Sequence, residues 1–107
     1  EAEAEKLRTD ALALQEAGCF AVVLEKIPAK LAEEVSQFLE IPTIGIGAGN
    51  GCDGQVLVVN DMLGMTKDFK PKFLRQYTNI YDIISTATAE YVADVKSQNY
   101  PNENEQY

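Results

Sequence analysis

Residues 19–47 read CFAVVLEKIPAKLAEEVSQFLEIPTIGIG, and this stretch decides the fold. The run CFAVVLE is apolar and of strand length, so we predict a strand that is buried on both faces. Pro28 suits the first turn of a helix, and residues 28–40 then follow an amphipathic pattern. The apolar positions predicted to share one face of this helix are Leu31, Val35, Phe38 and Leu39. The run IPTIGIG predicts a second short buried strand.

The residues before this stretch are predicted to form another helix, over residues 1–17. Leu7, Ala11 and Leu14 stand at helical spacing, and Gly18 suits the position after a helix C-terminus. The resulting order of helix, strand, helix and strand is typical of parallel βα units rather than of hairpins. We therefore predict an α/β fold in which residues 20–24 and 43–47 are adjacent parallel strands.

Two parallel strands do not make a stable sheet, because each leaves an edge without hydrogen-bond partners. The chain also begins inside a helical pattern, with no initiator methionine and no capping residue before it. From these features we expect a piece of a longer protein, whose other strands complete the sheet. The 107-residue chain alone is expected to be a poorly stable monomer.

The residues after the second strand give a weaker signal. In DGQVLVVNDMLG, residues 53–64, the β-branched composition is compatible with a strand, but Val56, Val59 and Leu63 keep helical spacing. We favour a short helix with Asp53 as its N-cap. A final helix is predicted over residues 79–97. Its apolar stripe would contain Ile80, Ile83, Ile84, Ala87, Tyr91 and Val95.

Composition excludes several classes of function. Hydrophobic residues make up 46% of the chain and charged residues 24%, and the net charge is -8. Such an acidic chain argues against a nucleic-acid partner, which requires a basic surface. No apolar run approaches the about 20 residues that span a bilayer, so we expect no membrane protein. The basic residues Lys67, Lys70, Lys72 and Arg75 are interpreted as a solvated patch, a substrate-steering patch or a subunit contact.

Metal-binding motifs are also missing from the sequence. The chain has no histidine, and its two cysteines, Cys19 and Cys52, lack the CxxC spacing. This composition argues against a zinc site. Unpaired cysteines are typical of a reducing compartment, so we expect a cytoplasmic protein.

Glu25 is the leading candidate for a catalytic residue. At the C-terminal end of a parallel strand, a side chain points into the crevice where α/β enzymes bind ligands. A carboxylate between apolar walls can serve as a general base near neutral pH. The alternative is that Glu25 caps the helix that begins near Pro28. Position alone leaves both interpretations open.

The glycine-rich stretch GIGAGNGCDG, residues 45–54, does not match the dinucleotide-binding pattern GxGxxG. Tight packing is the favoured explanation for Gly45 and Gly47. The turn after Gly49 could offer backbone N–H groups to an anion. Helix capping explains Asp53, and a solvated face explains Asp61, the two other acidic candidates.

Four segments, in order, resemble the C-terminal part of the ketopantoate hydroxymethyltransferase family. They are DALALQEAGCFAVVLEKIP, IPTIGIGAGNGCDGQVLVVNDMLGM, PKFLRQY and YVADVKSQNYP. The resemblance implies a (β/α)8 TIM barrel of the phosphoenolpyruvate/pyruvate superfamily. Residues 1–107 would then be the C-terminal segment of its single barrel domain, with the last βα units and the C-terminal helices.

The resemblance also implies an activity. Such enzymes transfer a hydroxymethyl group from 5,10-methylenetetrahydrofolate to 3-methyl-2-oxobutanoate, with Mg2+ holding the keto acid, and they act as homo-oligomers. Glu25 would be the base that removes the proton from C3 of the substrate. The family's metal ligands would lie upstream, so this segment alone should be inactive.

Two departures and one alternative accompany the resemblance. Lys26 stands where the family usually has a cysteine or another small residue, and the ending NENEQY lacks the family's histidine. The alternative is a small acidic α/β module that binds an anionic ligand or a protein partner through GAGNGCDG, without catalysis.

Overall fold

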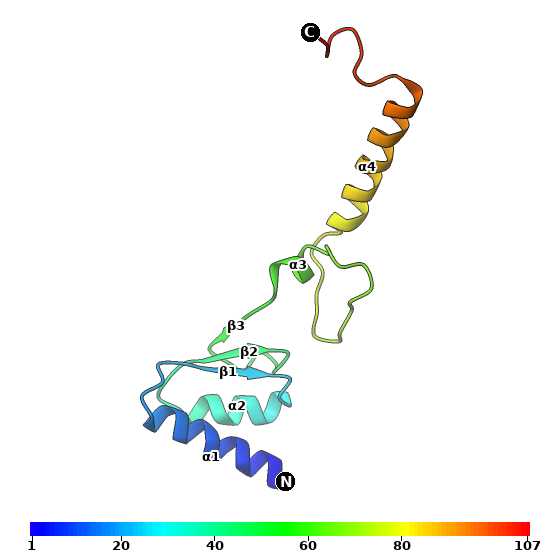
Figure 1. The fold of residues 1–107 in the computed structure, drawn as a ribbon. Helices are drawn as coiled ribbons and strands as arrows, with labels where there is room; N and C mark the ends of the chain where they lie inside the picture. The colour runs from blue at the N-terminus through cyan, green and yellow to red at the C-terminus, as the bar shows by residue number, and fades with distance from the viewer. The chain divides into compact units, whose positions relative to one another are not determined.

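The computed structural model describes all residues, 1–107, as a mixed α/β chain with one parallel sheet (Figure 1). The chain divides into two compact units. The first is Glu1–Val58 with Pro71–Leu74, and the second is Val59–Lys70 with Arg75–Tyr107. No helix is both long enough and apolar enough to cross a membrane.

The first unit contains the sheet and two helices. Its elements are α1 (Ala2–Glu16), β1 (Val22–Glu25), α2 (Ala29–Phe38), β2 (Thr43–Ile46) and β3 (Gly54–Gln55). The strands are parallel and lie in the order β1-β2-β3. Val22 pairs with Thr43 and Glu25 pairs with Ile46. The predicted adjacent parallel strands are therefore confirmed.

Gly18 and Pro28, the residues predicted to delimit helices, lie at the end of α1 and at the start of α2. The helix predicted over residues 1–17 is confirmed as α1, and Gly18 follows it with a φ of 90°, a left-handed conformation that favours glycine. Pro28 is the N-cap of α2 rather than its first helical residue. The φ of Pro28 is -53°, close to the angle that its ring imposes in any case.

The core of the first unit lies between β1 and the two helices. Figure 1 shows α2 against one face of the sheet, with α1 on the same side. Apolar side chains from α1, the β1 strand, α2 and the loops fill this layer: Ala11, Val22, Leu24, Ala32, Val35, Leu39 and Ala48. Val35 and Leu39 confirm the predicted apolar face of α2, whereas Phe38 is exposed.

The prediction that the first strand is buried on both faces is wrong for this structure. Successive side chains of a strand point to opposite faces, and burial alternates along β1 accordingly. Val22 and Leu24 are buried, but Val23 is 59% exposed. The reason is that α1 and α2 lie on the same side of the sheet, so they cover only one face.

The predicted helix beginning at Asp53 is also wrong at its start. Gly54 and Gln55 form β3 and pair with Ile44 and Gly45, and the helix α3 begins only at Val59 (Val59–Met62). The N–H of Val56 donates to the Gly45 carbonyl oxygen at 3.0 Å, which extends the pairing. These bonds join segments that are distant in sequence, so helical spacing gave no sign of them.

The connection between β2 and β3 consists of residues 47–53 alone. Parallel strands are usually joined by a dozen or more residues, most often with a helix. Here glycines let the chain run directly against α2. A Cβ atom on Gly49 would lie 2.5 Å from Cβ of Ala29, and one on Gly51 would lie 2.7 Å from Cβ of Glu33. The connection can be short because its backbone contacts the helix.

The second unit contains α3 and the long helix α4 (Ile80–Ser97). The helix predicted over residues 79–97 is confirmed, and the Asn79 side chain caps it by accepting from the N–H of Asp82 at 3.1 Å. Several positions of the predicted apolar stripe are exposed in the described chain: Ile83, Ile84, Tyr91 and Val95.

Two glycine substitutions test the packing of the connection on α2. Gly18 and Gly49 both have positive φ, but a Cβ on Gly18 would meet nothing within 4 Å. Gly18→Ala should therefore cost only the left-handed strain, about 1–2 kcal/mol. Gly49→Ala adds the clash with Ala29 and should destabilise clearly more, as measured by urea denaturation. A Gly49→Ala variant as stable as Gly18→Ala would contradict this packing.

Candidate functional site

Glu25 is the last residue of β1, at the carboxyl end of the sheet. The next residue, Lys26, has a φ of 53°, and its N–H donates to the Ile46 carbonyl oxygen at 2.8 Å. This bond continues the pairing with β2 while the left-handed turn takes the chain out of the strand. Glu25 is therefore the last side chain that the strand itself positions.

Capping does not explain Glu25. The N-cap of α2 is Pro28, and no side chain makes a capping hydrogen bond to that helix. The Glu25 carboxylate is exposed and makes no hydrogen bond or ion pair with another residue of the described chain. The interpretation of Glu25 as a helix cap is therefore wrong.

Glu25 shares one face of the sheet with apolar side chains. Val22 and Leu24 point toward the helices, so Val23 and Glu25 point to the opposite face. Register partners in parallel strands share a face, which places Ile44 and Ile46 on this same side. Glu25 thus stands at the rim of an apolar surface. Apolar side chains of the described residues border Glu25 on one side only, and its carboxylate is exposed.

An aromatic side chain lies at the carboxyl end of β2, next to the strand that carries Glu25. Gly47 follows Ile46 with a φ of 61°, and a Cβ there would lie 2.8 Å from Cγ of Phe73. Tight packing at Gly47 is therefore confirmed. Phe73 carries no signal in the sequence, because a single aromatic residue two positions after Pro71 has no periodic pattern.

The glycine-rich turn serves packing in this structure. A Cβ on Gly45 would lie 3.1 Å from Sγ of Cys52, which confirms the predicted tight packing there. The Gly49 carbonyl oxygen accepts from Nε2 of Gln55 at 2.8 Å. No helix begins at this turn, because β3 follows it. The turn therefore does not present the N–H groups of a helix start to an anion, the alternative that the sequence left open.

Asp53 lies at the opposite, amino end of the sheet. Its Oδ2 accepts from the N–H of Thr43 at 2.8 Å and from the Thr43 hydroxyl at 3.1 Å. The Thr43 backbone N–H, and next its hydroxyl, hold the pKa of the Asp53 carboxyl below its ordinary value of 3.8. Asp53 thus fixes the start of β3 to the start of β2, and its expected role as a helix N-cap is wrong.

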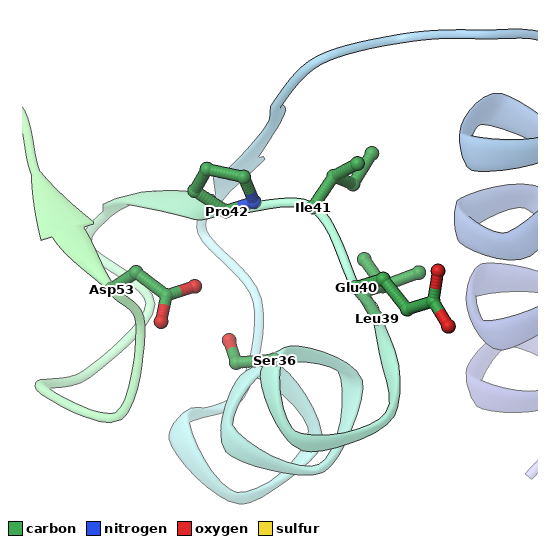
Figure 2. A pocket seen from close by; sticks show the side chains of 6 residues that line it. All are labelled: Ser36, Leu39, Glu40, Ile41, Pro42 and Asp53. Carbon is green, nitrogen blue, oxygen red and sulfur yellow. The ribbon is translucent and has the colours of Figure 1, made fainter.

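We call the hydrogen bonds between Asp53 and Thr43 the Asp53 anchor. A shallow pocket lies beside it (Figure 2). Its lining comes from the end of α2, from the following residues and from Asp53: Ser36, Leu39, Glu40, Ile41, Pro42 and Asp53. The hydroxyl groups of Ser36 and Thr43 lie 2.6 Å apart, and the Thr43 side chain is fully buried. The polar groups here bind each other, at the end of the sheet away from Glu25.

Comparison with known proteins identifies the family of the chain. The family model for ketopantoate hydroxymethyltransferase matches residues 1–103. The chain belongs to the ketopantoate hydroxymethyltransferase family. It is 62% identical over 107 residues to the 3-methyl-2-oxobutanoate hydroxymethyltransferase of Porphyromonas gingivalis. Proteins of the same name from Phocaeicola vulgatus and Christiangramia forsetii are 61% and 58% identical over 107 residues. Each match covers all of this chain but only 39% of the relative.

Acidic, cysteine and histidine side chains do not cluster in this member of the ketopantoate hydroxymethyltransferase family. The described residues hold no group of three or more His, Cys, Asp and Glu side chains that could bind an ion. Cys19 and Cys52 are free and half-buried, and Asp61 lies within α3.

Lys26 directly follows Glu25 and carries a charge of the opposite sign. Its left-handed backbone is strained, because a Cβ atom crowds the following carbonyl in this conformation. The Lys26 side chain is exposed. It therefore adds a positive charge at the same rim of the sheet that carries the Glu25 carboxylate.

The anchor at Asp53 predicts an acid-dependent contribution to stability. Because the folded-state pKa is lowered, ionised Asp53 stabilises the fold at every pH above 3.8. The contribution should be lost as the pH falls below 3.8 and through the folded-state pKa. Asp53→Asn should be less stable than the parent at pH 7, and the difference should shrink below pH 3.8. Urea denaturation from pH 7 to pH 2 measures both curves, and a constant difference would contradict the anchor.

Proposed function

We propose that this chain is the C-terminal segment of an enzyme that converts 3-methyl-2-oxobutanoate to ketopantoate, in pantothenate and coenzyme A biosynthesis. The hydroxymethyl group would come from 5,10-methylenetetrahydrofolate. The observation that carries the proposal is the position of Glu25. Its carboxylate makes no hydrogen bond or ion pair within the chain, and it stands at the carboxyl end of a parallel strand in a chain of this family. The names of the relatives give the reaction.

We propose that the segment belongs to a (β/α)8 barrel. In such a barrel, parallel strands pack their inner side chains against one another and carry their helices on the outside. The three parallel strands with α1 and α2 on one side fit this arrangement. Val23 on the other face is 59% exposed, as expected of a surface that further strands would cover. The chain spans 39% of its relatives, which leaves ample sequence for those strands.

Glu25 would act as the general base. Its carboxylate takes the proton from C3 of the keto acid, and the electron pair of that C–H bond forms the C2–C3 double bond of an enolate. C3 of the enolate then forms the new carbon–carbon bond to the one-carbon unit of the folate. Both C–N bonds of that carbon break, and it takes its hydroxyl group from water. Tetrahydrofolate leaves, and its two nitrogens take up the proton from C3 and the remaining proton of the water. Active sites of barrel enzymes lie at the carboxyl ends of the strands, which is where β1 places Glu25.

Mg2+ is the metal we propose for the complete enzyme. When bound, it would hold the keto acid and lower the energy of the negative charge that develops on the carbonyl oxygen. The ligands would come from outside this chain, since the described residues offer no suitable cluster. What this segment contributes is the base and the apolar surface below it.

The surroundings of the enzyme are also part of the proposal. We place it in the cytoplasm, which suits the two free cysteines. We also propose a homo-oligomer, because α4 exposes Ile83, Ile84 and Tyr91 to solvent in the described chain. Exposed apolar groups of this kind are typical of surfaces that another subunit, or more of the same chain, covers.

Replacing the proposed base tests the function directly. Glu25→Gln keeps the shape of the side chain and removes its basicity. Enolisation by the full-length enzyme should fall by about 10²–10⁴-fold, in kcat more than in KM. The measurement is deuterium exchange at C3 of 3-methyl-2-oxobutanoate, followed by NMR without the folate.

Two observations complete this test. Glu16→Gln changes an exposed glutamate at the end of α1 and should leave the exchange rate unchanged. Binding of 3-methyl-2-oxobutanoate to the Glu25→Gln enzyme, measured by calorimetry, should survive. Exchange at the parent rate in Glu25→Gln would remove Glu25 from the mechanism.

A further inference from the structure

The Phe73 side chain, from the segment Pro71–Leu74, contacts Gly47 at the carboxyl end of β2. The segment packs with the first unit, although residues on both sides of it belong to the second. A turn shapes it, in which the N–H of Leu74 donates to the Pro71 carbonyl oxygen at 3.0 Å. The Phe73 side chain is half-buried, whereas Phe69 is 47% exposed.

The contact of Phe73 with Gly47 is closer than any side chain at position 47 would permit. A Cβ there would lie 2.8 Å from Cγ, 2.9 Å from Cδ1 and 3.0 Å from Cβ of Phe73. The ring therefore lies directly on the backbone of Gly47. A positive φ at position 47 further favours glycine, so both the space and the backbone angle suit this contact.

The register of the strands places Gly47, which Phe73 contacts, next to the end of β1. Ile46 pairs with Glu25, and Gly47 is the next residue along β2. Adjacent strands lie about 4.8 Å apart. The ring of Phe73 is thus held at the end of β2, the strand next to the one that carries the proposed base.

We propose that Phe73 is a specificity-determining residue for the 2-oxo acid. Its ring forms an apolar wall for the branched alkyl group at the carbon that Glu25 deprotonates. The inference rests on the proposed function. A wall of fixed position limits how large the alkyl group can be, and it also favours the binding of an alkyl group that fills the space. One methylene more or less in an apolar pocket changes kcat/KM by about 10–200-fold.

Three substrates measure this selectivity in the full-length enzyme. They are 3-methyl-2-oxobutanoate, 2-oxobutanoate with one methyl fewer, and 3-methyl-2-oxopentanoate with one methylene more. Phe73→Ala should raise kcat/KM for deuterium exchange of the largest acid, relative to 3-methyl-2-oxobutanoate, by about 10-fold or more. It should also reduce the preference for 3-methyl-2-oxobutanoate over 2-oxobutanoate. Phe73→Leu retains more apolar volume and should change both ratios in the same directions, by less.

The controls separate selectivity from folding and from the proposed reaction. Phe69→Ala removes an exposed aromatic ring of the same chain and should leave all three ratios at their parent values. Equal loss of activity on the three acids in Phe73→Leu, or unchanged ratios in both Phe73 variants, would overturn the inference and make Phe73 a packing residue. If the parent enzyme exchanged none of the three acids, the proposed function itself would fail.

Discussion

The parallel pairing of β1 with β2 is the interaction on which the first unit depends. It brings together two short strands that are separated by α2 in sequence, and it sets Glu25 opposite Ile46. The same register places Val22 and Leu24 toward the helices and Val23 and Glu25 away from them. A shift by one residue would turn Glu25 into the core and Leu24 out of it. The hydrophobic contacts of Leu24 with the helical layer therefore also fix where the carboxylate stands.

Glycine packing extends this pairing to a third strand. The connection between β2 and β3 is too short to contain a helix of its own, so it uses the surface of α2 instead. Gly49 and Gly51 permit contact with Ala29 and Glu33 that no larger residue could make. The glycine pattern that suggests an anion site is thus explained by the close approach of backbone to helix. No helix begins at this turn, so the structure gives no observation in favour of a module that binds an anion there.

The two ends of the sheet are built differently. At the amino end, Asp53, Thr43 and Ser36 form a closed set of hydrogen bonds that joins β2 to β3. At the carboxyl end, the Glu25 carboxylate makes no bond within the chain, and Phe73 lies on the backbone of Gly47. Polar groups that bind each other stabilise the fold, whereas a carboxylate without a partner is available to a ligand. The separation matches the division in parallel α/β folds between a structural end and a reactive end.

Sequence alone determined the elements whose cause is local. Gly18, Pro28 and Asn79 delimit helices, and the apolar runs ending at Glu25 and Ile46 give parallel strands. The places of α1, α2 and α4, and of Glu25 at the end of β1, were therefore predicted correctly. Only the tertiary structure decided β3, the exposed side of β1, the role of Asp53 and the position of Phe73. Each of these depends on a segment distant in sequence. Gln55 pairs with Gly45, Asp53 accepts from Thr43, and Phe73 contacts Gly47. Val23 is exposed because the helices cover only the other face of the sheet. Spacing within a segment carries no information about which other segment it will meet, because that choice is made by packing.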